Sequence, residues 1–322
     1  MTWSLSARRI AALIAALSLW TGCDGEIKPG ATGGSANTAG QAGSAGAAGG
    51  SDTGVGGTAT DLSCPARPGP SMVLVKAPNG TPYCIDTTEV TQAQYQEFLA
   101  KVSGKPGTEH PECSANESYV PESHQPNPID SISCVLTYTP DETPNQPVVC
   151  VDWCDAKAYC SWAGKRLCGK VGGGDGVFNS ELIGKAGDPA VDANLSEWYS
   201  VCSQGGKTTY PYGDTYAPGR CEDAAVSPES DGGYPSKKDV AAQDQCVGAT
   251  DPFSQVHDLS GSVKELTNEC SPTETAGSSM CVSRGGYFAS GAHDLSCLEY
   301  GGVYRMGPRH QAIGFRCCGD PG

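Results

Sequence analysis

Cysteine is the residue type in this sequence with the most chemistry to offer, because a thiol can form a disulfide, carry a lipid or bind a soft metal ion. The 322-residue chain has 17 cysteines; Cys23 follows an apolar N-terminal run, and the rest lie between Cys64 and Cys318. They include no Cys-x-x-Cys pair, the spacing typical of zinc knuckles. An even number beyond Cys23 in a Gly- and Pro-rich body predicts that all of these pair in an oxidising compartment.

The N-terminus predicts export and lipid attachment. Arg8 and Arg9 precede an apolar stretch at 10–20, which suits the core of a signal peptide and is too short to span a bilayer. The residues before Cys23 are similar to a bacterial lipobox, so we expect a signal peptide at 1–22 and acyl chains on Cys23. The protein is then extracytoplasmic, in the periplasm or at the cell surface of a bacterium, with the membrane as a partner through its lipid anchor. The alternative is an ordinary secretory signal with a stray thiol.

Composition divides the rest of the chain into two parts. Residues 23–60 are rich in Gly, Ala, Ser and Thr and cannot bury a core, so they predict a flexible tether. Residues 61–322 have a length that suits one domain. The formal net charge of −15 argues against nucleic acid as a partner, because phosphate binding needs clustered Lys and Arg.

Few regular elements are available to position the cysteines. The composition of 72–75 and 83–86 predicts two strands. Thr91 is suited to cap a first helix, and a second helix is predicted over 153–163, ending at Gly164. Elsewhere Gly, Pro, Asn and Asp recur every few residues, so we expect a loop-rich domain that disulfides keep ordered.

Eight short sequence blocks occur in an order that matches a known family. They are Met72-Val73, Asp86–Tyr95, Gln146–Leu167, Ser196–Tyr199, Tyr210–Asp214, Asp258–Glu265, Arg284–Gly286 and Ile313–Cys317. Together they resemble the formylglycine-generating enzyme family, also called sulfatase-modifying factors. The resemblance covers nearly the whole domain and implies an α+β fold, the C-type lectin-like variant, with two early helices and long loops. A Gly-rich insertion at about 168–195 is expected to be a surface excursion.

The copper ligands of that family are missing from this sequence. Active members oxidise a cysteine of a sulfatase to formylglycine with oxygen, using Cu(I) held by two thiolates, which are soft ligands that suit Cu(I). The resemblance places these thiolates between the Gly-Gly block and Cys297, and no cysteine lies there; Ser290 stands at the first position. We therefore expect neither copper nor catalytic residues. A candidate groove remains at Tyr287, Ser290, His293 and Asp294.

The pairing of the cysteines follows partly from the resemblance and partly from proximity. The family's two long-range disulfides carry over as Cys160–Cys317 and Cys202–Cys297. Local proximity in the sequence suggests Cys64–Cys84, Cys113–Cys134, Cys154–Cys168, Cys221–Cys246 and Cys270–Cys281, which leaves Cys150–Cys318.

Two further ligand classes are weighed from the sequence. The resemblance implies calcium sites, here weakened to Ser262 and Glu265 at one site and Glu222 at the other; a solvated acidic turn is the alternative. The histidines His257, His293 and His310 lack metal-ligand spacing.

Other conspicuous side chains are interpreted as structural. The pair Glu265 and Glu269 has helical spacing and is interpreted as a solvated turn. Trp153, Trp162 and Trp198 accompany the predicted helices and family blocks, so we expect them in the core.

These observations favour a catalytically diverged binding or scaffold module. Its loops would recognise a protein, a peptide or a glycan. The alternative is an oxidoreductase of the same family, which would use copper or iron to oxidise a sulfatase cysteine or another thiol substrate.

Overall fold

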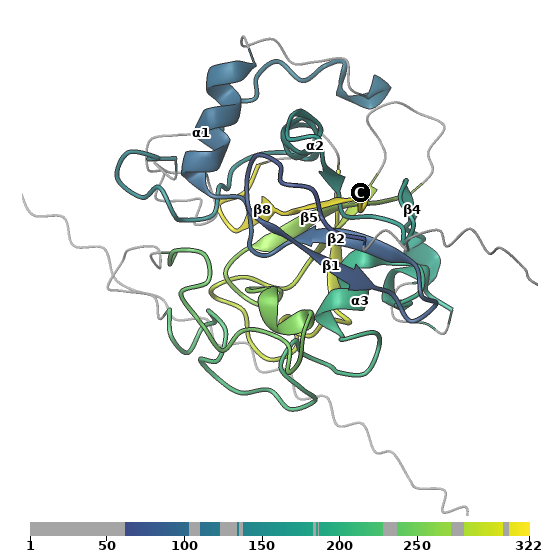
Figure 1. Cartoon of the computed structure of the whole chain (residues 1–322). Helices are drawn as coiled ribbons and strands as arrows, with labels where there is room; N and C mark the ends of the chain where they lie inside the picture. The colour runs from purple at the N-terminus through teal and green to yellow at the C-terminus, as the bar shows by residue number, and fades with distance from the viewer. Residues whose placement is uncertain are drawn as a thin grey trace, which may run out of the picture. The chain divides into compact units, whose positions relative to one another are not determined.

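The described part of the chain contains two small β-sheets and three short α-helices joined by long loops (Figure 1). The computed structural model describes residues 62–102, 110–122, 134, 138–182, 185, 187–227, 237–271, 280–304 and 309–322. The predicted signal peptide, Cys23 and the predicted tether lie outside these residues and stay predictions.

The first sheet joins the start of the domain to its end. Its strand order is β1-β2-β9-β3, and all its pairings are antiparallel. Its strands are β1 (Met72–Lys76), β2 (Pro82–Asp86), β9 (Cys317–Gly319) and β3 (Arg166–Leu167). The two strands predicted near the N-terminus of the domain are therefore confirmed.

The second sheet is built around β5. Its path runs β4-β5-β6-β7, and β8 pairs with β5 in parallel. Its strands are β4 (Gly176–Val177), β5 (Lys264–Cys270), β6 (Met280–Arg284), β7 (Tyr300–Tyr304) and β8 (Ile313–Phe315).

The insertion at 168–195 is more than the surface excursion we expected. It supplies β4, which pairs in parallel with β5, and it buries Phe178 and Ala190. A Cβ at Gly176 would lie 2.6 Å from the Cγ of Glu269, so glycine permits this close approach of the two strands. Part of the insertion is therefore integral to the second sheet.

Side-chain caps define where the helices begin. Helix α1 (Gln92–Lys101) starts after Thr91, whose Oγ1 accepts a hydrogen bond from the Gln94 amide at 3.3 Å, as predicted. Helix α2 (Trp153–Trp162) starts after Asp152, and α3 (Glu197–Cys202) starts after Ser196. Short 3₁₀ turns occur at η1 (Pro111–Cys113), η2 (Ser180–Leu182), η3 (Pro189–Val191) and η4 (Phe253–Gln255). Among the described residues, no helix has the length and apolar character needed to cross a bilayer.

Aromatic side chains fill the core beneath α1 and α2. The rings of Tyr95 and Tyr159 stack at 5.6 Å, and Tyr159 meets Phe315 of β8 edge-on at 5.4 Å. A second core cluster joins β1 and β2 to α3 through Val75, Ile85 and Trp198, among others. Trp153 and Trp198 are buried in the core, as expected, whereas Trp162 is only partly buried and packs against the first cluster.

Five of the expected disulfides are present in the structure. They are Cys64–Cys84, Cys160–Cys317, Cys202–Cys297, Cys221–Cys246 and Cys270–Cys281. The first family pair ties α2 to β9, across a sequence separation of 157 residues.

Three expected disulfides are wrong. Instead of Cys113–Cys134, Cys154–Cys168 and Cys150–Cys318, the chain forms Cys113–Cys154, Cys134–Cys150 and Cys168–Cys318. The β3–β9 ladder explains the last pair, since Arg166 lies opposite Cys318 and Cys168 follows β3 directly. Proximity in the sequence does not reveal such contacts between distant segments.

Candidate functional site

A glycine turn after β6 sets the course of the candidate groove segment. Gly285 and Gly286 have φ values of +92° and +67°, a region that disfavours side chains. A Cβ on Gly286 would also lie 2.8 Å from the carbonyl oxygen of Asp294, so the segment folds back tightly on itself. The Phe288 amide then donates to the Ser262 carbonyl at 2.9 Å. The turn thus holds residues 287–294 against the loop that precedes β5.

Ser290 fills a structural role in this turn. Its side chain is buried, and its Oγ accepts a hydrogen bond from the Tyr287 amide at 3.1 Å. The Ser290 carbonyl accepts from the Ala224 amide at 3.2 Å. The residue at the expected copper position therefore closes a turn.

The side chains of the candidate groove residues do not gather around one cavity. His293 is highly exposed, and its ring nitrogens lie 3.4 Å from an Asp294 oxygen and 3.3 Å from a Glu299 oxygen. A small polar cavity of about 50 Å³ opens beside this segment, lined by Arg284 and Tyr300 among others. Of the four candidate residues only Asp294 lines it. The structure therefore offers an exposed His–Asp–Glu surface here and not a groove formed by all four side chains.

The thiols of the described chain leave no soft ligand pair for copper. All cysteines from Cys64 to Cys318 are joined in eight disulfides. The copper site that the resemblance implies needs two thiolates, and a disulfide sulfur is not a thiolate. The residues present do not fit the family's metal.

Behind the segment, two buried arginines bind two acids on β5. Arg316 donates from Nε and Nη2 to the two carboxylate oxygens of Glu265, at 2.8 and 2.7 Å. Glu265 also accepts from the Trp198 indole at 2.8 Å. Arg284 donates from Nε to Glu269 at 2.8 Å. The interpretation of Glu265 and Glu269 as a solvated turn is therefore wrong: both lie buried on a strand and are paired.

The predicted calcium ligands Ser262, Glu265 and Glu222 all form hydrogen bonds to other groups of the protein. The Ser262 amide donates to the Glu222 carbonyl at 3.0 Å, so the two predicted sites are adjacent. The Glu222 carboxylate accepts from Ser227 Oγ at 3.0 Å and from the Lys238 amide at 3.1 Å. Both oxygens of Glu265 are bound by Arg316. Within the described ranges, no three His, Cys, Asp or Glu side chains gather as a metal site. Calcium binding stays a prediction.

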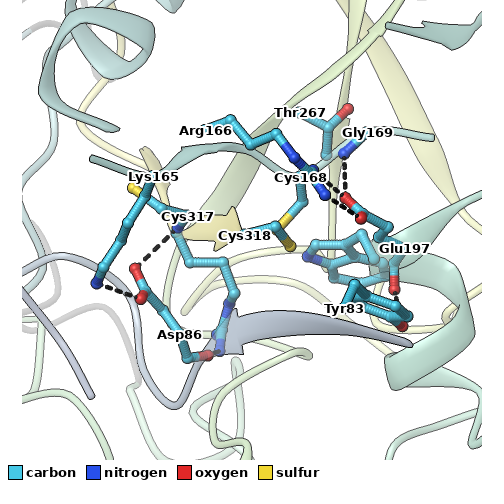
Figure 2. The surroundings of a disulfide bond; sticks show 12 residues. Tyr83, Asp86, Lys165, Arg166, Cys168, Gly169, Glu197, Thr267, Cys317 and Cys318 are labelled. Carbon is cyan, nitrogen blue, oxygen red and sulfur yellow. Dashed lines mark hydrogen bonds and ion pairs between the residues drawn. A yellow bond between two sulfur atoms is a disulfide. The ribbon is translucent and has the colours of Figure 1, made fainter. Parts of the chain in front are cut away.

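A second ionic network links strands β2, β3 and β9 of the first sheet to one another and to α3 (Figure 2). Lys165 Nζ lies 2.6 Å from an Asp86 oxygen, and the other oxygen of Asp86 accepts from the Cys317 amide at 2.9 Å. Arg166 binds both oxygens of Glu197 at 2.6 Å. This network lies next to the Cys168–Cys318 bridge, so covalent and ionic links hold the same junction.

Two buried carboxyl groups near Arg316 have raised pKa values. Glu89 is fully buried, its nearest oxygen is 4.0 Å from Arg316 Nη2, and neither oxygen has a hydrogen-bond partner among the described residues. Burial raises the pKa of Glu89 well above its usual value, and the nearby Asp258 carboxylate adds to this. Burial likewise raises the pKa of Asp258 to about 7. Sequence patterns gave no signal for either residue beyond their place in the family blocks.

Because Glu89 and Asp258 have raised pKa values, we expect the free energy of unfolding to fall as the pH rises. Between the unfolded pKa of Asp, near 3.9, and the folded value of about 7, the folded protein keeps a proton on Asp258 that the unfolded chain has lost. Because of this group, the free energy of unfolding should fall by on the order of 2–3 kcal/mol between pH 5 and pH 8. Urea unfolding at both pH values measures the loss.

Asp258→Asn is expected to flatten this pH dependence. Asn tolerates the φ of 59° at this position and can still accept the bond from the Ala241 amide. Asp239→Asn, at an exposed site, serves as the matched control and should leave the dependence unchanged. Equal slopes in both variants would contradict the assignment.

The chain is similar to known proteins in both sequence and fold. The family model for the sulfatase-modifying factor enzyme 1-like domain matches residues 75–321. The chain is 26% identical over 269 residues to a mouse (Mus musculus) protein described as inactive C-alpha-formylglycine-generating enzyme 2, covering 75% of this chain and 76% of that protein. Among solved structures, PvdO from Pseudomonas aeruginosa is similar with a TM-score of 0.51 and 16% identity, over 80% of this chain and 97% of that chain. CarF is similar with a TM-score of 0.42 and 18% identity, over 74% of this chain and 86% of that chain.

Proposed function

The chain belongs to the sulfatase-modifying factor enzyme 1-like family, and we propose that it is a diverged member that binds a partner without generating formylglycine. Its fold is the α+β, C-type lectin-like fold of that family, as predicted. The observation that carries the proposal is the pairing of all sixteen domain cysteines in eight disulfides. The mouse relative, whose name describes it as inactive, agrees with it.

The pairing of the thiols also supports an extracytoplasmic location. Eight disulfides persist where the glutathione and thioredoxin systems do not reduce them. We propose that Cys23 carries the lipid that tethers the domain to a bacterial membrane, with residues 23–60 as the spacer. The partner is a protein, peptide or glycan that contacts the surface around His293 and Asp294, because these exposed side chains stand on a turn that glycines and backbone bonds hold in place.

Intact-mass analysis of the full chain tests the thiol pairing directly. Treatment with iodoacetamide without reduction is expected to add no mass to the domain, and with reduction to add sixteen carbamidomethyl groups, because every domain thiol is in a bridge. The same spectrum should show acylation of Cys23, and a Cys23→Ser variant should lose it. Two modified domain cysteines without reduction would contradict the proposal.

A formylglycine assay separates the two functional classes. The full chain, supplied with Cu(I), oxygen, a reductant and a cysteine-containing sulfatase peptide, is expected to leave the peptide mass unchanged. A Ser290→Cys variant should also stay inactive, since it restores only one of two thiolates. Conversion of the peptide by the wild-type chain would favour the oxidoreductase alternative. In binding assays on peptide and glycan arrays, His293→Ala/Asp294→Ala should remove the signals that the wild-type chain gives.

A further inference from the structure

A second candidate site lies away from residues 287–294. A cavity of about 510 Å³ opens where β1 meets the loop after α3 and the turn before η4. Small-molecule sites typically have volumes of about 300–1,000 Å³, so this one has room for a ligand. No residue of the candidate groove lines the cavity.

The floor of the cavity is apolar because β1 breaks the usual alternation of a half-solvated strand. Val73 and Val75 point into the second core cluster, so Leu74 and Lys76 face outward. Outward positions of such a strand are normally polar, yet Leu74 is apolar and only partly buried. Pro78, after β1, and Phe253, in η4, complete an apolar wall.

The net charge of the side chains that line this cavity is positive, because two lysines face one acid. Lys76 and Lys207 line it, both are exposed, and neither forms an ion pair with a described residue. The one acid in the lining, Asp251, accepts a hydrogen bond from Ser254 Oγ within its own turn. The side-chain amide of Gln204 donates to the Pro211 carbonyl and accepts from the Ala249 backbone amide. The two lysines outnumber this acid and are the cations available to recognise an anion, in a chain whose formal charge is −15.

We propose that this cavity binds a small amphiphilic anion. Its apolar body lies against Leu74, Pro78 and Phe253, where burial of apolar surface favours binding. Its carboxylate or sulfonate head is bound by Lys76 and Lys207. This site adds to the proposed function and does not depend on it.

Photolabelling of the full chain with 4-benzoylbenzoate, an aromatic carboxylate, tests the site. Peptide mapping is expected to place the label on the segments around Leu74–Pro78 and Pro252–Phe253. Lys76→Glu/Lys207→Glu should reduce this labelling about tenfold, because it reverses the charges that bind the head. Neutral benzophenone should label both proteins within about twofold, since the apolar wall is unchanged. The matched control, Lys101→Glu/Lys170→Glu, reverses two exposed lysines elsewhere and should label like wild type.

Competition identifies the source of the anion. Displacement by dodecanoate indicates an acyl-chain ligand, and displacement by naphthalene-2-sulfonate indicates a flat aromatic ligand. Failure of both competitors would overturn the proposal, as would equal carboxylate labelling of the wild type and Lys76→Glu/Lys207→Glu. Unchanged melting temperatures of the two double variants confirm that the comparison is made between folded proteins.

Discussion

A variant that lacks both the Cys160–Cys317 and Cys168–Cys318 bridges is expected to lose about 7 kcal/mol of unfolding free energy. That loss exceeds the sum expected from removing each bridge alone, about 5 kcal/mol in total. Domains are typically stable by only about 5–15 kcal/mol, so the double variant should be barely folded or unfolded.

The non-additivity follows from where the two bridges are attached. They span sequence separations of 157 and 150 residues, yet Cys160 and Cys168 are close in sequence and Cys317 and Cys318 are adjacent. While one bridge remains, the other closes a loop of only about ten residues, worth about 2.5 kcal/mol. Only when both are gone does the unfolded chain regain the entropy of the long loop.

Urea unfolding of Cys→Ala pair variants measures these losses. Removal of Cys270–Cys281, which has a separation of 11 residues and is also buried, provides the matched control. Its loss of about 3 kcal/mol should add to the loss caused by removing either long-range bridge. If the losses from the two long-range bridges were simply additive, the chain-entropy account of this junction would be wrong.

The disulfides also show which cysteine pairs can be predicted from their separation in the sequence and which cannot. Cys270–Cys281 is predictable because the antiparallel β5–β6 pair places these two neighbours opposite each other, and Cys64–Cys84 because its residues are only 20 positions apart. Cys168–Cys318 depends on the β3–β9 ladder, and β3 has only two residues, too few for a readable pattern. Cys113–Cys154 depends on a packing of η1 against α2 that Asn116 reinforces by donating to Asp155 at 2.8 Å.

The local sequence around the acids of β5 is ambiguous for a related reason. A spacing of four places Glu265 and Glu269 on one face of a helix, but the same spacing also fits one face of a strand. Their cations, Arg316 and Arg284, lie on other segments, 51 and 15 residues away, so the local pattern does not signal that both carboxylates are buried and paired. The missing thiolates near Ser290, by contrast, could be recognised from the sequence because residue type alone decides whether a soft ligand is present.

Arg316→Met is expected to cost about 3–5 kcal/mol of unfolding free energy. The side chain is fully buried, and besides Glu265 it donates to the backbone carbonyls of Asp86 at 3.1 Å and His257 at 2.7 Å. Methionine would fill much of the volume but leave the Glu265 carboxylate buried without its cation. The half-exposed Arg220, which stacks over Tyr212 at 4.9 Å, is the control; Arg220→Met should cost at most about 1 kcal/mol.

A double-mutant cycle shows whether Arg316→Met destabilises the protein by leaving a buried carboxylate without its cation or by removing packing contacts. If the charge dominates, Arg316→Met/Glu265→Gln should cost less than the sum of the single variants, with a coupling of at least about 1 kcal/mol. Glu89→Gln should also partly rescue Arg316→Met, because Glu89 lies 4.0 Å from the lost guanidinium and has no other compensating contact among the described residues. Additive losses would show instead that packing and the backbone contacts of Arg316 carry its effect.

The pH dependence of the Arg316→Met variant gives the same distinction independently. Arg316 favours the ionised form of Glu89, so its removal should raise the pKa of Glu89 further. The folded variant then keeps a proton that the unfolded chain has lost, and its stability should rise as the pH falls from 8 to 5. The gap between variant and wild type should therefore narrow at pH 5 if stranded carboxylates cause the loss. A gap that is the same at both pH values would mean that Arg316 acts through its shape and backbone contacts, and that charge at this buried junction contributes little.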